Sequence, residues 1–136
     1  MVKKASPNSK LFVNCLKAFV FGGLICGAAQ VFYNFILNSG FAADETSAIT
    51  SETLIFIAAM LTGMGVYDKI GKHAGAGTIV PITGFSNSVA APAVEFKKEG
   101  FIFGVGAKMF AIAGPVIVYG VLTSVIIGLI YFYFFK

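Results

Sequence analysis

The segment from Ala74 to Glu95, AGAGTIVPITGFSNSVAAPAVE, most constrains what this chain can form, because glycine, proline and small hydroxyl residues interrupt an apolar run. Pro81 and Pro92 lack a backbone N–H, and each disfavours helical geometry in the residue before it. The pattern therefore predicts a break in the backbone. At membrane depth such a break is stable only where protein or a water-filled cavity covers the bare polar groups. We expect residues 74–95 to form a re-entrant, broken-helix hairpin that lines a solute path.

The composition places the chain in a bilayer, since 57% of its 136 residues are hydrophobic and only 12% are charged. This balance is typical of an all-α integral membrane protein whose first partner is lipid. We expect a basic tail over residues 1–10 and a single membrane domain over residues 11–136. Its predicted transmembrane helices cover about residues 12–37, 49–67 and 116–135. Gly114-Pro115 is expected to divide the last of them from an interfacial or half-inserted helix over residues 101–113.

The charged residues predict the orientation of the chain. Lys3, Lys4 and Lys10 precede the first apolar run, whereas residues 38–52 carry three acidic side chains and no lysine. Lysine-rich flanks stay on the cytoplasmic side of a membrane. The N-terminus is therefore expected inside, and the first run is expected to remain as an uncleaved helix because it is longer than the core of a signal peptide.

Several functional classes are excluded or disfavoured. The chain contains no nucleophile elbow, zinc-protease motif or phosphate-binding loop, so we do not expect an enzyme. His73 is the single histidine and has no cluster of ligands around it, so neither a metal nor a cofactor is expected. Cys15 and Cys26 lie roughly 16 Å apart along one helix and cannot pair with each other. The lysines form no stripe with spaced aromatic residues, which argues against nucleic-acid binding.

Polar residues at membrane depth are the candidates for the solute path. If a half-helix begins near Ser86 to Ser88, its N-terminus beside Asn87 favours an anion, whereas freed carbonyls at Pro81 to Thr83 would suit a cation. Hydrogen bonding between helices is the alternative role for these side chains. Charges at the mouth of the path are weaker candidates, namely Asp68, Glu95 and Lys108. The predicted path residues are Thr78, Pro81, Thr83, Gly84, Ser86, Asn87 and Ser88.

The stretch from Leu61 to Gly120, with its core AGAGTIVPITGFSNS, resembles the stage V sporulation A membrane proteins, in particular their AC branch. The resemblance extends to GGLICGAAQ at residues 22–30 and covers most of the chain. It implies a small integral protein of the inner spore (forespore) membrane. The family belongs to a complex that moves dipicolinic acid, chelated to calcium, into the forespore and releases it at germination. The AC branch is also associated with tension-sensitive channel behaviour.

The resemblance further implies the partners of this chain, which are the AE-b and AD proteins of the same complex. A single chain with three spans and one hairpin has too few membrane segments to enclose a pore by itself, so we expect a homo-oligomer or a hetero-oligomer. The family supplies no catalytic residues, and the predicted path residues therefore rest on physical argument alone. The alternative function is a membrane adaptor that docks a soluble partner and conducts nothing.

Overall fold

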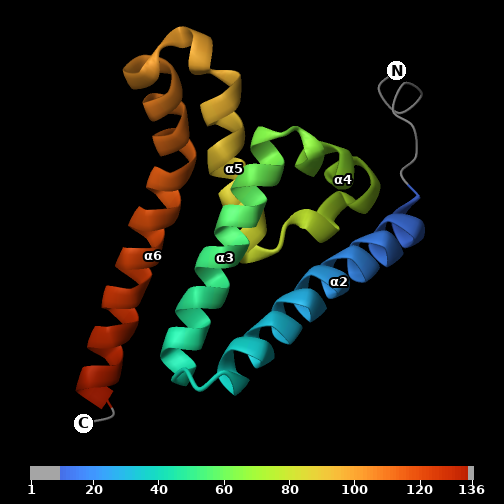
Figure 1. The fold of residues 1–136 in the computed structure, drawn as a ribbon. Coiled ribbons are helices and arrows are strands. Elements are labelled where there is room, and N and C mark those ends of the chain that lie inside the picture. Colours follow the sequence, from blue (N-terminus) through green and yellow to red (C-terminus); the bar gives the residue numbers. More distant parts are fainter. Residues whose placement is uncertain (1–9, 135–136) are drawn as a thin grey trace. The chain divides into compact units, whose positions relative to one another are not determined.

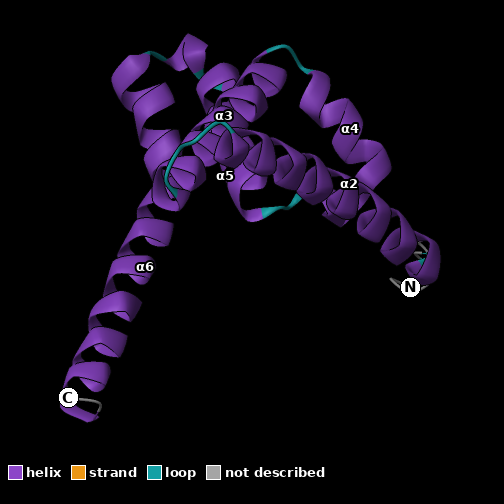
Figure 2. Ribbon diagram, turned by 60° about the horizontal axis from the view of Figure 1, so that its bottom comes forward, coloured by secondary structure: helices purple, strands orange, loops and turns teal. Residues whose placement is uncertain are grey.

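The computed structural model describes residues 10–134, and every regular element among them is helical (Figures 1 and 2). Residues 1–9 of the predicted basic tail therefore lie outside the described residues, which include only its last residue, Lys10. Within the described part, three helices are long and apolar enough to cross a membrane: Leu11–Asn38, Ala43–Gly63 and Phe101–Phe134. The predicted all-α membrane fold with about three spanning helices is confirmed.

The chain divides into two units, residues 1–87 and residues 88–136. In the first unit, α2 (Leu11–Asn38) and α3 (Ala43–Gly63) are joined by a short turn and diverge from it (Figure 1). The helix α4 (Val66–Ala74) and the 3₁₀ turn η1 (Gly75–Thr78) follow and pack against α2. The helix α5 (Pro81–Glu95) then begins in the first unit and ends in the second.

The helix α3 begins at Ala43, earlier than the start near residue 49 predicted from the apolar run. Its first turn contains Asp44 and Glu45, whose negative charge is favourable at the positive end of the helix dipole. The Ala42 N–H donates to Glu45 Oε2 at 3.3 Å, which caps this end. Two of the three acidic side chains in residues 38–52 thus lie in the first turn of a membrane-length helix.

The predicted interruption is present, but it lies earlier than expected. The backbone leaves η1 at Thr78, passes through Ile79 and Val80, and begins α5 at Pro81. The half-helix predicted to begin near Ser86 to Ser88 is therefore wrong, and so are the freed carbonyls at Pro81 to Thr83, which accept the bonds of the first turn. Proline is favoured at the first position of a helix, where its missing N–H costs nothing.

The second unit, residues 88–136, is built from the end of α5 and three further helical elements. After α5 come the short turn η2 (Lys97–Glu99), a π-helical turn η3 (Phe101–Gly106) and the long helix α6 (Ala107–Phe134). The helix runs through Gly114 and Pro115, so the predicted division into an interfacial helix and a separate span is wrong. Proline removes one backbone hydrogen bond, whereas a break in hydrocarbon would expose several polar groups.

The side chains buried in the first unit are mostly small or carry hydroxyl groups: Thr46, Thr50, Ala58, Tyr67, Ala74, Thr78, Thr83 and Ser86. Most large apolar side chains of α2 are instead exposed, and none of its residues is buried. Small and hydroxyl residues inside with bulky apolar residues outside are typical of helices that pack together in lipid. The chain is therefore an integral membrane protein.

Candidate functional site

The helix α5 carries most of the predicted path residues and holds two of them against the rest of the first unit. Thr83 and Ser86 are buried, with exposed fractions of 7% and 8%. Ser86 Oγ donates to the Ile55 carbonyl of α3 at 2.9 Å. Since Ile55 lies in the middle of α3, this bond fixes the first half of α5 to a membrane-length helix.

Asn87 makes a second link between the same two helices. The Thr62 hydroxyl lies 2.8 Å from Asn87 Oδ1 and 2.7 Å from the Ala58 carbonyl oxygen of its own helix. A hydroxyl carries one hydrogen, so Thr62 shares it between an interhelical and an intrahelical acceptor. Ser86 and Asn87, both predicted path residues, thus form hydrogen bonds between helices, which was the alternative role for these side chains.

The remaining predicted path residues are placed as follows. Pro81 and Gly84 lie in the first turn and a half of α5, and the Gly84 N–H donates to the Val80 carbonyl at 2.7 Å. Thr78 ends η1 and is buried. Ser88 is half-buried in α5 and is the first residue of the second unit. Whether any of these residues touches a solute stays a prediction.

Thr78, the last residue before the break, is covered by protein. The Thr78 hydroxyl donates to the Gly75 carbonyl at 3.1 Å, and the Thr78 carbonyl accepts a 2.9 Å hydrogen bond from the Tyr67 hydroxyl. Tyr67 is buried in α4 and was not predicted as part of the site. A buried tyrosine usually finds a partner for its hydroxyl, but the sequence alone does not show which residue that partner is.

The broken segment also lies directly on the backbone of α2. A Cβ built on Gly77 would be 2.6 Å from the Ala18 carbonyl oxygen and 3.1 Å from the Phe21 Cβ. Both distances are shorter than normal van der Waals contact, so no larger residue fits at position 77 without moving α2. The glycine is required here for close approach rather than for a positive φ.

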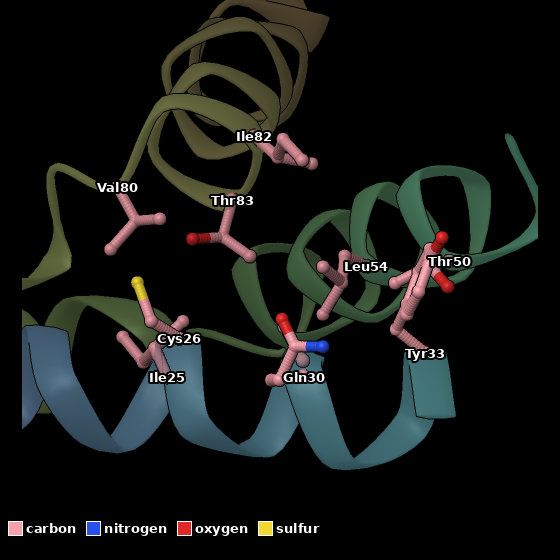
Figure 3. Close-up of a pocket in the computed structure, with 10 residues that line it drawn as sticks. Ile25, Cys26, Gln30, Tyr33, Thr50, Leu54, Val80, Ile82 and Thr83 are labelled. Carbon is pink, nitrogen blue, oxygen red and sulfur yellow. The ribbon is translucent and has the colours of Figure 1, made fainter. Parts of the chain in front are cut away.

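A cavity of about 250 Å³ opens between α2, α3 and the start of α5 (Figure 3). Two of its lining side chains, Thr50 and Thr83, are each 7% exposed, and neither hydroxyl has a hydrogen-bond partner. Among the described residues, no charged residue lines the cavity. The lining residues are Ile25, Cys26, Ala29, Gln30, Tyr33, Thr50, Leu54, Val80, Ile82 and Thr83. The cavity thus has a mostly apolar lining without net charge, and we call it the hydroxyl cavity after Thr50 and Thr83.

Thr50 differs from the other threonines of its helix. Thr46, Thr53 and Thr62 each donate to the carbonyl four residues earlier, at 2.7 to 2.9 Å. Thr50 makes no such bond, although the helical carbonyl of Thr46 is available at the same spacing. A buried hydroxyl without a partner loses its hydration without compensation, so the separate hydroxyls of Thr50 and Thr83 are the unsatisfied groups of this site.

Among the candidate mouth charges, Asp68 pairs with Lys72 at 2.8 Å, with both side chains about 70% exposed. The hydrogen bond and the charge of Asp68 raise the pKa of Lys72 above its usual 10.5. In the second unit, Glu95 ends α5 and is exposed, and Lys108 Nζ lies 4.6 Å above the ring of Phe96. These positions suit charged groups at a membrane interface. That the three charges lie at the mouth of a solute path stays a prediction.

Within residues 10–134, no three His, Cys, Asp or Glu side chains lie close enough to hold a metal ion. His73 Nδ1 lies 2.9 Å from the Lys69 carbonyl, which the neutral or charged ring can satisfy by donating its proton. Both cysteines are free and exposed on α2.

Residues 14–130 match the SpoVAC/SpoVAEB sporulation membrane protein family. The chain is also similar to the stage V sporulation protein AC of Bacillus subtilis (strain 168), with 48% identity over 136 residues that cover 99% of this chain and 91% of the relative. No solved structure matches the chain. The matched region contains α3, the break and α5 in full, together with almost all of α2 and α6. The chain therefore belongs to the SpoVAC/SpoVAEB family of sporulation membrane proteins, which is not a known enzyme family.

Proposed function

We propose that this chain is a membrane subunit of a spore complex that moves dipicolinic acid with calcium during sporulation and germination. The family supports a role in a spore membrane. The observation that carries the proposal is the pair of unpartnered, buried hydroxyls of Thr50 and Thr83, which line a cavity beside the backbone break. Both hydroxyl oxygens are closed off in this conformation, and a turn of either side chain toward the cavity would offer a passing polar solute a hydrogen bond in place of water.

The uncharged lining decides which form of the solute suits the hydroxyl cavity. Bare dipicolinate is a dianion, and its transfer into a cavity without cations would carry a large desolvation cost. A one-to-one complex with calcium has no net charge, so that cost falls. A threonine hydroxyl can donate to a carboxylate and can also present its oxygen to calcium. The proposal is therefore that the neutral calcium chelate, rather than the free anion, passes this site.

The proposal extends to assembly and location. One cavity in one chain does not make a continuous pore, so the path is completed by further copies of this chain or by the AE-b and AD proteins of the complex. The N-terminus lies on the inner side of the inner spore membrane, in line with the lysines at that end. Membrane tension opens the path, as the resemblance to the AC branch implies.

Release from liposomes tests this function. Calcium dipicolinate is trapped in liposomes that contain the protein alone or with its partner proteins, and release after osmotic downshift is followed by terbium fluorescence. Thr83→Val removes the unpartnered hydroxyl and keeps the shape, so release should slow at an equal amount of protein. Thr53→Val is the matched control, because the Thr53 hydroxyl donates to its own helix at Ile49. Equal release from both variants would contradict the role of Thr83.

A second candidate function is a membrane adaptor that conducts nothing. The observation that favours it is that Ser86 and Asn87 are occupied in bonds to α3, as packing residues would be. Single Thr83→Cys, Ser86→Cys and Asn87→Cys variants, made in a Cys15→Ser/Cys26→Ser chain, separate the two functions in the assembled complex. Modification by a small water-soluble thiol reagent supports the path, and complete protection at all three positions supports the adaptor.

A further inference from the structure

A second polar cavity, of about 410 Å³, lies where the C-terminal end of α4 meets the N-terminal part of α2. It is distinct from the hydroxyl cavity, with which it shares no lining residue. Three of its side chains can carry positive charge, and none carries negative charge. The lining residues are Asn14, Lys17, Lys72, His73, Ala74, Gly75 and Ala76, and we call this the basic cavity.

Lys17 is the unusual member of this set. It lies six residues after the start of α2, which places it about 9 Å along the axis of a membrane-length helix. A lysine inside such a helix is costly unless it reaches water or meets an opposite charge. Within residues 10–134, no carboxylate forms a salt bridge with Lys17. Its charge is therefore without a protein partner at the wall of a cavity.

Lys72 differs from Lys17 because its charge is already balanced by Asp68 at 2.8 Å. Asp68 forms its ion pair with Lys72 and none with Lys17, and it does not line the cavity. The net charge of the lining therefore stays positive, with Lys17 as its uncompensated cation. The Asn14 side chain adds an amide that can donate to an oxygen atom.

The floor of the basic cavity is rigidly attached to its wall. Ala74 is fully buried at the end of α4, and the neighbouring Gly77 lies against the Ala18 backbone one residue after Lys17. The backbone from Ala74 to Gly77 is thereby held at a fixed distance from α2. A binding site whose parts are fixed in advance loses less entropy on binding a ligand.

We propose that the basic cavity binds the oxyanion of a carboxylate or phosphate group, with Lys17 as the principal charge partner and Asn14 and Lys72 as further donors. Two sources carry this chemistry, namely the phosphate of an anionic lipid headgroup and a small free anion. The inference does not depend on conduction by this chain. It holds for a transport subunit and for an adaptor alike.

The test uses the full chain in nanodiscs of phosphatidylcholine, which supply no anionic headgroup. Calorimetric titrations with pyridine-2,6-dicarboxylate and with inorganic phosphate measure the free anions. In a second arm, native mass spectrometry counts phosphatidylglycerol molecules retained by protein prepared with that lipid. Lys17→Gln should weaken binding in at least one arm by about tenfold or more, the usual effect of losing a charged hydrogen bond. Lys69→Gln is the matched control, since it removes an α4 lysine that does not line the cavity.

The arms also identify the source of the anion. Loss of the calorimetric signal alone supports a free anion, loss of retained phosphatidylglycerol alone supports a lipid headgroup, and loss of both supports a site that accepts either. Lys17→Arg keeps the charge and should retain binding, which separates loss of charge from misfolding. The proposal is overturned if the unmodified protein binds no probe in either arm, or if Lys69→Gln weakens binding as much as Lys17→Gln.

Discussion

Gly77 and Ala18 are in backbone contact, so that a Cβ at position 77 would lie 2.6 Å from the Ala18 carbonyl oxygen and 3.0 Å from its Cα. These two residues bring the broken segment onto the first membrane helix. Because both groups of atoms belong to the backbone, neither can rotate away from an added methyl group. The position of the break in the first unit thus depends on one missing side chain.

Gly77→Ala should therefore lower the stability of the protein by about 1 to 3 kcal/mol, the usual cost of overpacking. Thermal unfolding in detergent, followed by gel filtration, measures the loss. Gly23→Ala is the matched control, since a Cβ at Gly23 meets nothing within 4 Å, and a helical glycine replaced by alanine gains up to about 1 kcal/mol. Equal melting temperatures for the two variants would contradict the contact.

The bond between Thr62 and Asn87 is expected to contribute measurable coupling between α3 and α5. Thr62→Val, Asn87→Leu and the double variant form a cycle in which unfolding by SDS gives each change in stability. Polar pairs between membrane helices average about 0.6 kcal/mol and reach about 1.7 kcal/mol. We expect a coupling energy in that range, and additive effects of the two single variants would show that the 2.8 Å contact contributes no coupling energy.

The sequence was sufficient to predict the class of fold and the presence of a break. Apolar length predicted the three membrane helices, and Pro81 predicted an interruption. The position of the break was misjudged because the polar run Ser86-Asn87-Ser88 was given more weight than the preference of proline for the first turn of a helix. In the structure, Ser86 and Asn87 of that run are satisfied by α3, and such tertiary partners are not visible in a single sequence.

The ends of the other helices also depend on surroundings that the sequence alone does not show. Acidic residues after a turn predict either a loop or the first turn of a helix, and Glu45 decides for the helix by capping Ala42. Pro115 predicts a break in water but remains inside α6, because a break in hydrocarbon exposes more backbone than the proline removes. Tyr67 could not be assigned to the site, since its bond to Thr78 depends on how α4 folds back toward η1.

Asp68→Asn is expected to have a small effect on stability, and this effect should depend on pH in the alkaline range. The ion pair is about 70% exposed, so solvent screens it. Asp68 raises the pKa of Lys72 in the folded protein. The ion pair therefore contributes its full stability while the pH is below the lysine pKa of the unfolded chain. This contribution is lost as the pH rises through the higher pKa of Lys72 in the folded protein. The difference between variant and parent should thus be constant from about pH 6 to pH 9 and disappear once the pH has risen well above the usual lysine pKa of 10.5.

Thermal unfolding of both proteins across this range provides the measurement. Added salt at about 1 M should also remove the difference, because it screens exposed charges. A difference that grows as the pH rises above about 10.5 would contradict the assigned direction of the Lys72 shift.

Thr50→Val tests whether the hydroxyl cavity is empty or filled. If the Thr50 hydroxyl has no partner, its replacement by a methyl group of similar shape should raise the free energy of unfolding by about 1 kcal/mol or more. If water or solute bonds the hydroxyl, the same variant should instead be less stable. We expect a gain in solute-free detergent and a loss of that gain when calcium dipicolinate is added. Thr53→Val serves as the control, since its hydroxyl is bonded in both conditions.

The thiols of Cys26 and Cys15, both on α2, provide a second test of whether water and solute enter the hydroxyl cavity. Both thiols are exposed, but only Cys26 lines the hydroxyl cavity. In the assembled complex, a charged methanethiosulfonate reagent should modify Cys26 if water reaches that cavity, because such reagents do not dissolve in hydrocarbon. Calcium dipicolinate should then slow the modification of Cys26 and leave that of Cys15 unchanged.

The measurement is made on Cys15→Ser and Cys26→Ser variants, each of which retains one thiol, with labelling followed by mass spectrometry. N-ethylmaleimide, which is neutral, provides the control for whether each thiol can react at all. Because only the thiolate reacts and it does not form in hydrocarbon, a Cys26 that reacts with neither reagent would mean that hydrocarbon fills the cavity. Thr50 and Thr83 would then be unpaired in lipid, and the path for the calcium chelate would have to lie elsewhere in the complex.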